Sequence, residues 1–378
     1  MQLYSSKYCF NKMNRFTPLI TALFFSLLAG SLVSSCQLLS NGKVSLNVSE
    51  KPFELLSDYH FFKDDLKALI PNEKVLPYDL ASALFSDYAH KARFIFVPQG
   101  KAIAYQDKDV LNLPVGSCYI KNFYYPFDFR DEKKGRRIIE TRLLVHREAG
   151  WEALDYIWND EQTDATLDVA GDVKQVSWIH TDGSKKSIDY IIPNKNQCKG
   201  CHWSNGNSAI MPIGPKARNL NHEYTYVEGK KNQLTKWKEV RILTGLPDLK
   251  QCPDMPDYTN ASADLNLRAR AYLDINCAHC HSADGPAYTS GLYLNYDSQD
   301  QEHLGICKTP VAAGRGTGNL LYDILPGKPE ESILHYRMKS DDAGIRMPEV
   351  GRSQLHKEGL DLIAQWIALQ KGACGTSN

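Results

Sequence analysis

Two short segments of the sequence carry the same arrangement of two cysteines and one histidine. Each is a C-x-x-C-H pentapeptide, formed by Cys198, Cys201 and His202 in the first segment and by Cys277, Cys280 and His281 in the second. Residues three apart lie on the same side of a helical turn, so both thiols can reach the two vinyl groups on one edge of a porphyrin. The histidine then projects over the ring as an axial ligand to iron. This spacing is typical of c-type haem attachment, so the sequence predicts two covalently bound haems c.

Other chemistries that use C-x-x-C pairs fit the sequence less well. A zinc site could combine both pairs, but the interval from Cys201 to Cys277 is far longer than that of a zinc ribbon, and both histidines would be coincidental. A dithiol redox motif belongs to a βαβ unit, and neither segment has that context. We do not expect His279, which lies between the cysteines of the second segment, to bind iron.

The two predicted irons differ in the sixth ligand that the sequence offers. Met347 lies well downstream of His281, just before the last predicted helix, and we expect it to bind the second iron. A thioether ligand raises the reduction potential relative to a second histidine, which suits an electron carrier. For the first iron, Met211 lies nine residues beyond His202 and is the first candidate. The alternatives are His180, His222 and Met255. An iron with no sixth protein ligand could bind a small molecule or react with peroxide.

The N-terminal residues have the layout of an export signal. Basic residues precede an apolar stretch over 16–33, and Val-Ser-Ser-Cys then ends at Cys36. A cysteine after small residues resembles the lipobox of bacterial lipoproteins, in which that cysteine is lipidated. Gln37 in the next position resembles lipoproteins sorted to the outer membrane. An uncleaved anchor helix and a signal peptide without lipid are the alternatives. In each case we expect the folded part outside the cytoplasm, and as a lipoprotein it would lie at the periplasmic face of a bacterial membrane, the outer membrane.

The remaining cysteines predict a disulfide, because export leads to an oxidising compartment. Of ten cysteines, four lie outside the signal, the lipobox and the two segments. Cys307 and Cys374 both belong to the region of the second segment, and we expect them to pair. Cys118 and Cys252 either pair with one another or stay free. The charges are balanced at 44 basic and 44 acidic residues with no basic stripe, so no nucleic-acid partner is expected.

The elements that must position these residues change in character along the chain. Runs rich in β-branched and aromatic residues predict strands over 92–98, 117–127 and 137–148, with hairpin turns at 148–150 and 181–183. Helices are expected over 232–245, 265–276 and 353–371. The predicted fold is multidomain α+β: signal peptide 1–35, linker 36–60, β-rich domain 61–193, first haem segment 194–246, linker 247–263, and an all-α cytochrome c-like domain 264–378.

Several phrases of the sequence together resemble a known family. They include "PNKNQCKGCH", "PIGPKARNLN", "CAHCHSADGPAYTSGL", "ICKTPVAAGRG" and "PGKPEESILHYRM". The chain resembles bacterial dihaem c-type cytochromes with a β-rich N-terminal region, over about residues 55–374. Its C-terminal part is similar to a class I cytochrome c domain, in which a helix leads into the haem segment, a Met-Pro loop follows, and a last helix packs on the first. Tyr272 and Trp366 would be the contacts between those helices.

The resemblance implies redox chemistry outside the cytoplasm and leaves the reaction open. The leading hypothesis is electron transfer between periplasmic or cell-surface redox partner proteins. The alternative is a haem enzyme, peroxidase-like or acting on another small molecule, with an open coordination site at the first haem. A third hypothesis gives the β-rich domain a binding role through Trp151, Trp158 and Trp178, although such aromatic residues more often belong to a core.

Overall fold

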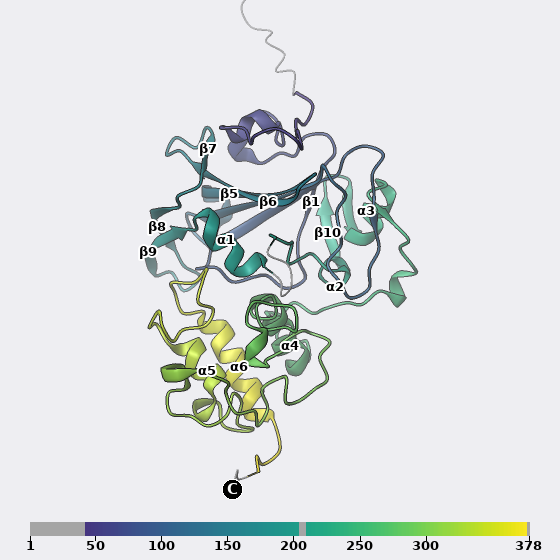
Figure 1. Ribbon diagram of the computed structural model, residues 1–378. Coiled ribbons are helices and arrows are strands. Elements are labelled where there is room, and N and C mark those ends of the chain that lie inside the picture. Colours follow the sequence, from purple (N-terminus) through teal and green to yellow (C-terminus); the bar gives the residue numbers. More distant parts are fainter. Residues whose placement is uncertain (1–41, 204–208, 376–378) are drawn as a thin grey trace, which may run out of the picture. The chain divides into compact units, whose positions relative to one another are not determined.

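The computed structural model describes residues 42–203 and 209–375, and a six-stranded antiparallel sheet organises its N-terminal half (Figure 1). The strand order is β1 (Val75–Tyr78), β2 (His90–Phe96), β4 (Cys118–Pro126), β5 (Arg136–Arg147), β6 (Gly150–Trp158) and β7 (Ala165–Asp168). A separate hairpin contains β8 (Asp172–Ile179) and β9 (Lys185–Ile192). The predicted strands and both predicted hairpin turns are confirmed, because alternating apolar residues and turn residues specify antiparallel pairing locally.

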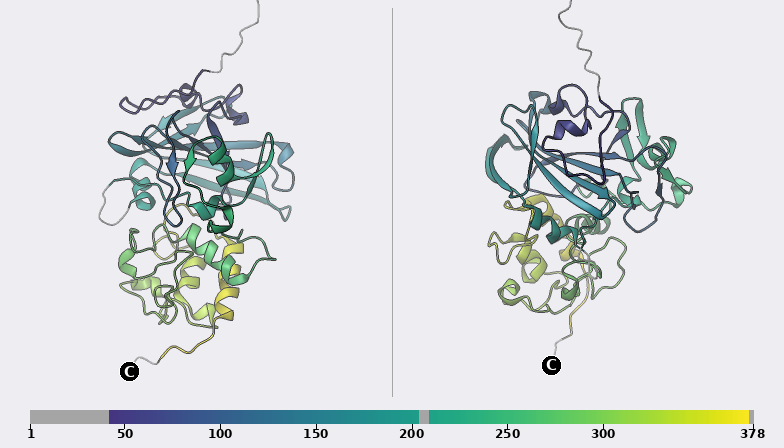
Figure 2. Two further views of the ribbon diagram at one scale, coloured as in Figure 1. Left: turned by 90° about the vertical axis from the view of Figure 1, so that its right-hand side faces the viewer. Right: turned by 45° about the horizontal axis from the view of Figure 1, so that its top comes forward.

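One face of this sheet is apolar and is covered by residues 42–70 (Figures 1 and 2). These residues include the 3₁₀ helices η1 (Leu56–Tyr59) and η2 (Leu66–Ala68). Side chains alternate between the two faces of a strand, so every second residue reaches this core. Its buried members include Leu56, Tyr59, Phe94, Ile120, Leu143 and Tyr156. The predicted linker 36–60 is therefore wrong in its described part, because Leu56 and Tyr59 bury large side chains here.

The segment between the sheet and the C-terminal helices is also folded onto the rest of the chain. It contains α1 (Lys195–His202), α2 (Ala217–Leu220), β10 (Glu223–Tyr226), β11 (Gly229–Asn232) and α3 (Gln233–Glu239). The helix predicted over 232–245 is shorter, because the chain then forms β12 (Leu243–Thr244), which pairs in parallel with β3 (Ile103–Ala104). The linker predicted over 247–263 is wrong in the same way as the first, since Cys252, Met255 and Tyr258 are buried.

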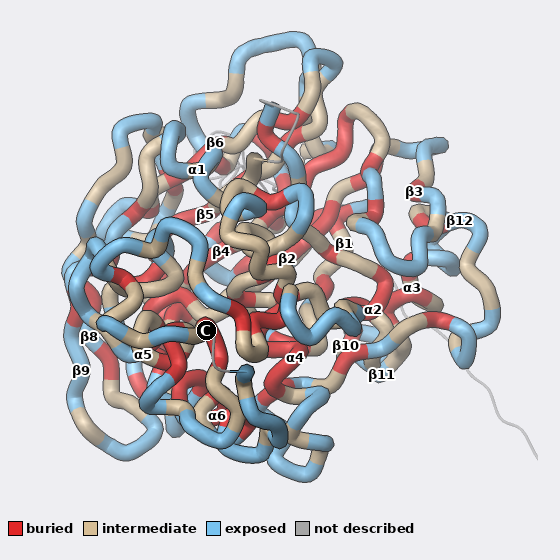
Figure 3. Tube along the Cα trace, turned by 60° about the horizontal axis from the view of Figure 1, so that its bottom comes forward, coloured by how far each residue is buried: buried red, intermediate tan, exposed pale blue. Residues whose placement is uncertain are grey.

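The C-terminal region contains α4 (Leu265–Asn276), α5 (Ile333–Lys339) and α6 (Lys357–Leu369). α4 has the predicted bounds, and its N-cap Asp264 accepts a hydrogen bond from the Leu267 amide. α6 begins four residues later than predicted, because the Ser353 and Gln354 amides donate to the Asp87 carboxylate instead. Buried stretches run through both helices and through the strands (Figure 3). The mixed α and β composition is confirmed.

Contacts between α4 and α6 use the two aromatic residues that the sequence indicated. The Tyr272 hydroxyl lies 3.1 Å from His356 Nδ1, at the start of α6. The Trp366 indole donates to Asn266 Oδ1 at 2.8 Å, at the start of α4. Both aromatic side chains belong to one buried cluster with Leu273, Leu362, Ile363 and Ile367.

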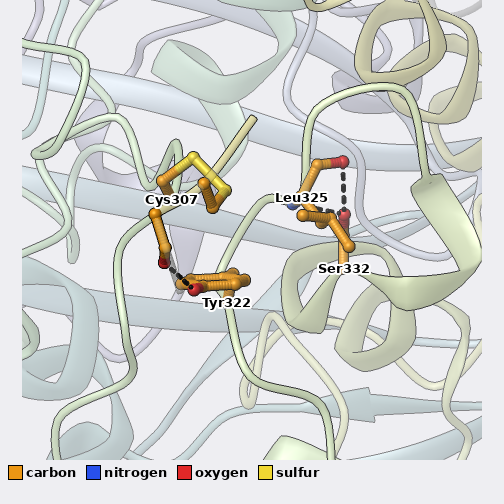
Figure 4. Close-up of a disulfide and its surroundings, with 6 residues drawn as sticks. Cys307, Tyr322, Leu325 and Ser332 are labelled. Atoms are coloured by element: carbon orange, nitrogen blue, oxygen red, sulfur yellow. Dashed lines mark hydrogen bonds between the residues drawn. A yellow bond between two sulfur atoms is a disulfide. The ribbon is translucent and has the colours of Figure 1, made fainter. Parts of the chain in front are cut away.

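The Cys307–Cys374 disulfide is present and ties the chain end to this region (Figure 4). The bond spans 67 residues of sequence, and the Tyr322 hydroxyl donates to the Gly375 carbonyl beside it. Cys118 and Cys252 are both buried free thiols, so the second pairing that the sequence left open does not form. Five short 3₁₀ helices complete the elements: η3 (Glu132–Lys134), η4 (Leu249–Gln251), η5 (Tyr288–Ser290), η6 (Gly314–Thr317) and η7 (Pro329–Glu331).

Buried polar contacts join the C-terminal helical region to the rest of the chain. Arg218 and Asp274 form an ion pair at 2.9 Å with both side chains more than nine-tenths buried. The Phe85 amide donates to Asn276 Oδ1 at 2.8 Å. Breaking such a buried pair leaves an uncompensated charge, so these contacts hold the two regions in one compact unit. Over the residues that the structure describes, no helix has the length and hydrophobicity needed to cross a membrane.

Candidate functional site

The first C-x-x-C-H segment forms the C-terminal half of α1. The helix starts at a capping box: Asn194 Oδ1 accepts from the Gln197 amide, and Gln197 Oε1 accepts from the Asn194 amide, both at 2.9 Å. Cys198 and Cys201 are therefore one helical turn apart, as the sequence predicted. Neither is in a disulfide. The cap fixes where the helix begins and so sets the direction of both thiols.

His202 is oriented by a backbone contact with Met211. The His202 Nδ1–H donates to the Met211 carbonyl at 2.8 Å, and the Met211 amide donates to the His202 carbonyl at 2.7 Å. Burial lowers the pKa of His202, and the bond to Met211 opposes that shift. A neutral imidazole whose Nδ1 is held by a carbonyl presents the Nε2 lone pair, which is the metal-binding form.

The same contact bears on the predicted sixth ligand of the first iron. The Met211 backbone lies on the Nδ1 side of the imidazole, whereas iron would lie on the Nε2 side. The Met211 side chain is 38% exposed. This geometry gives Met211 an orienting role for His202, and its role as sixth ligand stays a prediction.

The alternative ligands at the first iron are engaged elsewhere. The His222 ring lies 2.9 Å from Gln233 Nε2 and 3.1 Å from the Glu223 carbonyl, so both nitrogens have partners. His180 Nδ1 accepts from the Trp178 indole at 3.3 Å. Met255 is buried in the core of the helical region. None of these three residues is held next to the first segment by a contact that the structure shows within its described residues.

The second segment follows directly from α4. Cys277 is the C-cap of that helix, and the Cys280 and His281 amides donate to the Cys277 carbonyl at 3.1 and 2.8 Å. The resulting turn carries both cysteines and the histidine. His281 Nδ1 lies 3.2 Å from Ser290 Oγ, whose own hydrogen is donated to the Ala287 carbonyl. Here too Nδ1 has a partner and Nε2 has none among the described residues.

Burial and a nearby arginine act on the His281 imidazole. Burial, with a smaller contribution from Arg337, lowers the pKa of His281 to about 4. Arg337 also holds the Met347 loop: its carbonyl accepts from the Met347 amide at 3.0 Å, and its Nε donates to the Ile345 carbonyl at 2.8 Å. Met347 is half-buried. One arginine thus acts on both His281 and the predicted ligand loop, and ligation by Met347 stays a prediction.

The two segments meet, which the sequence analysis did not predict. Ligand atoms of Cys201, His279 and Cys280 all lie within 4.8 Å of one another. Cys280 Sγ is also 3.9 Å from the Gly200 carbonyl. A hydrogen bond from Cys280 lowers the pKa of Cys201 to about 4 against the effect of burial, and His279 lowers it further. No spacing in the sequence indicates this contact, because the two segments are far apart along the chain.

The donor set can be compared with each chemistry that the sequence raised. The cluster at the junction has three donors from two segments, whereas a structural zinc site uses four. The donors of each segment separately, two free thiols and one imidazole with its Nδ1 engaged, match those of a covalent haem. Each segment therefore offers the donors of a covalent haem, and the three donors at the junction are too few for a structural zinc site.

One cavity of the described residues is lined by side chains outside both segments. Its volume is about 390 Å³, and its lining includes Arg218, Arg270, Tyr296 and Trp366. None of the segment cysteines or histidines lines it.

Comparisons with protein-family models, with curated proteins and with solved structures gave no match for this chain. Cys36 and the predicted signal lie outside the described residues.

Proposed function

We propose that the chain is an exported dihaem c-type cytochrome that transfers electrons between redox partner proteins. The observation that carries the proposal is common to both segments. In each, two free thiols three residues apart precede a histidine whose Nδ1 has a hydrogen-bond partner, which leaves Nε2 for a metal. Two independent copies of this arrangement in one chain support paired haems over thiol chemistry.

Each segment would hold its haem through its own residues. Cys198 and Cys201 would bind the first haem, with His202 as ligand. Cys277 and Cys280 would bind the second, with His281 and Met347 as ligands. When bound, a haem supplies one-electron redox chemistry to the protein. The chain contributes the orientation of each imidazole, through the Met211 carbonyl at the first segment and the Ser290 hydroxyl at the second.

The C-terminal region is proposed to be a class I cytochrome c-like domain. α4 leads into the second segment, the Met347 loop follows, and α6 packs on α4. The export signal, lipidation at Cys36 and a position at the periplasmic face of a bacterial outer membrane complete the proposal. They account for the Cys307–Cys374 disulfide, which is stable in an oxidising compartment.

A second candidate is a haem enzyme, peroxidase-like or acting on another small molecule at the first segment. The position of Met211 favours it, because the backbone bond to His202 holds Met211 on the side of the imidazole away from iron. An iron without a sixth protein ligand can bind a substrate, whereas a carrier keeps both axial positions filled.

Absorption spectra of protein matured with haem-attachment machinery separate the two candidates. The oxidised, reduced and carbon monoxide-treated reduced protein would be recorded. An electron carrier is expected to show two low-spin haems that do not respond to carbon monoxide. One high-spin haem that binds carbon monoxide would replace the carrier by the enzyme. A protein without haem absorption would contradict both.

A further inference from the structure

The face of the six-stranded sheet opposite the apolar core carries neighbouring like charges. The strand register places Arg93, Lys121 and Arg142 directly beside one another on β2, β4 and β5. Alternate residues share a face, so Lys91 and Phe123, two positions along, lie on this face as well. Like charges directly opposite in a sheet are destabilising. We call the four cations Lys91, Arg93, Lys121 and Arg142 the cationic row.

The two arginines of the row each have an acidic partner, and only Arg93 has a buried nitrogen without one. Arg142 pairs with Glu140 at 2.6 Å, and Arg93 pairs with the half-exposed Asp79 at 2.7 Å. Arg93 is only 5% exposed, and its Nη2 is buried without a hydrogen-bond partner. Asp155 lies 3.5 Å from Arg142, but burial and repulsion by Glu140 hold its pKa well above the usual range, so it adds little negative charge.

The two lysines have no acidic partner among the described residues. Lys91 Nζ donates to the Leu84 carbonyl at 2.8 Å. Lys121 Nζ lies 4.8 Å from the centroid of the Phe123 ring, and no hydrogen bond or ion pair joins it to the described part of the chain. An ammonium group taken out of water without an anion is costly, so the row is short of negative charge.

The cationic row faces the first C-x-x-C-H segment. Burial and repulsion by Arg93 and Arg142 hold the pKa of Lys121 well below its usual range, while Glu140 and the Cys201 thiol oppose that shift. α1, which carries Cys198 and Cys201, packs against β6. Cys198 also shares a small cavity with Asp155 on β6. Cys198 therefore lies against the sheet face that carries the cationic row, because Asp155 is the register partner of Arg142 on β5.

We propose that the cationic row binds the carboxylates of the group attached at the first segment, the propionates of the first haem. This inference rests on the proposed function. Lysine and arginine form strong charge-assisted hydrogen bonds with carboxylates, and two carboxylates would balance the two unpaired lysines. Binding of two carboxylates would thus explain why the sheet keeps four neighbouring cations that it does not stabilise by itself. Its residues would position the first haem and raise its reduction potential, because positive charge favours the reduced form.

The test is a redox titration of the matured, haem-loaded protein carrying Lys121→Met. The variant and the wild type would first be shown to hold two haems each. The midpoint potential of each haem in the variant would then be compared with that in the wild type. We expect the potential of one haem to fall, with a shift of about tenfold in its reduced-to-oxidised ratio, which is about 59 mV for one electron. Lys186→Met, an exposed cation on β9, is the matched control and should leave both potentials unchanged.

Further variants and a ligand-binding measurement give results that could contradict the proposal. Lys121→Arg should retain the wild-type potential, and Lys91→Gln should give the same fall if Lys121→Met does not mature. Two bound haems with unchanged potentials in both charge-removing variants would overturn the proposal and leave the proposed function intact. Succinate that raises the melting temperature of the loaded wild type, but not of Lys121→Met, would assign the row to free carboxylates instead. A wild type without covalent haem would overturn the proposed function itself.

Discussion

The first C-x-x-C-H segment ends a short helix beside a charged sheet face, whereas the second follows a long helix packed into an apolar core. Their histidines differ in the same way. His202 Nδ1 donates to the Met211 backbone carbonyl, whereas His281 Nδ1 lies next to the Ser290 side-chain hydroxyl. The same five-residue pattern therefore has two environments. In the proposed function the motif would specify attachment, and the surrounding elements would decide the potential and the access to iron.

The strongest test of whether the two segments act separately is to remove the thiols of one segment at a time. Cys198→Ser with Cys201→Ser should leave one haem per chain, and Cys277→Ser with Cys280→Ser should leave the other, because each thiol pair is proposed to attach its own haem. Pyridine haemochrome spectra would give the number of haems per chain, and each double variant should have half the number found in the wild type. Cys118→Ser, at a buried free thiol on β4, is the matched control and should keep both haems. Loss of both haems from either double variant would mean that the segments form one shared site.

The sixth ligand of each iron is a second point on which the two segments can be compared. Met347→Ala should convert one low-spin haem to a form that binds carbon monoxide, because Met347 is the predicted sixth ligand of that iron. Met211→Ala tests the same role at the first iron: a response would make Met211 its sixth ligand, and no response would leave only the backbone contact with His202, which alanine retains. Carbon monoxide difference spectra measure both effects. No response in Met347→Ala would contradict its assignment as the sixth ligand of the second iron.

The Cys307–Cys374 disulfide cross-links the helical region, whereas the cysteines of the first segment are free. Cys307→Ser with Cys374→Ser should lower the free energy of unfolding by about 2–4 kcal/mol, since the bond closes a long loop in the unfolded chain. Denaturant titration followed by circular dichroism measures this change. The first haem should keep its potential in this variant. A simultaneous change in the first haem would show that the two segments are not independently supported.

The smallest expected effect concerns pH and the start of α6. Burial lowers the pKa of His356 to about 4, and its ring stacks on Phe85 with centroids 4.0 Å apart. The unfolded state binds this proton at higher pH, so stability is present above about pH 6.5 and is lost as pH falls toward 4. The contribution of His356 is up to about 3 kcal/mol. His356→Phe should flatten the dependence of unfolding free energy on pH, while His303→Gln, at an exposed histidine, should not. Parallel curves for wild type and His356→Phe would contradict this assignment.

Local patterns in the sequence were sufficient for the elements but not for their assembly. The bounds of α4 and the β5–β6 and β8–β9 hairpins could be predicted, because capping residues, periodicity and turn residues act over a few positions. The two predicted linkers were wrong because isolated apolar residues such as Leu56 and Tyr258 carry no periodicity, yet they are buried by distant parts of the chain.

The candidate site divides in the same way. The thiols and histidines of each segment are evident from spacing, since attachment is a local property. The contact of Cys201 with His279 and Cys280 depends on tertiary packing. Lys121 in "CYIKNFYY" resembles a solvent-facing position of an alternating strand. Its place between Arg93 and Arg142 depends on the register of three strands, which the sequence alone does not give.

The most direct test of the account is a count of covalent haem in the wild-type chain. The protein would be matured with haem-attachment machinery, denatured, and measured by pyridine haemochrome absorbance against protein concentration. The account predicts two haems per chain that stay with the polypeptide after denaturation. A chain without covalent haem would contradict the account and would return the cluster of Cys201, His279 and Cys280 to metal or thiol chemistry.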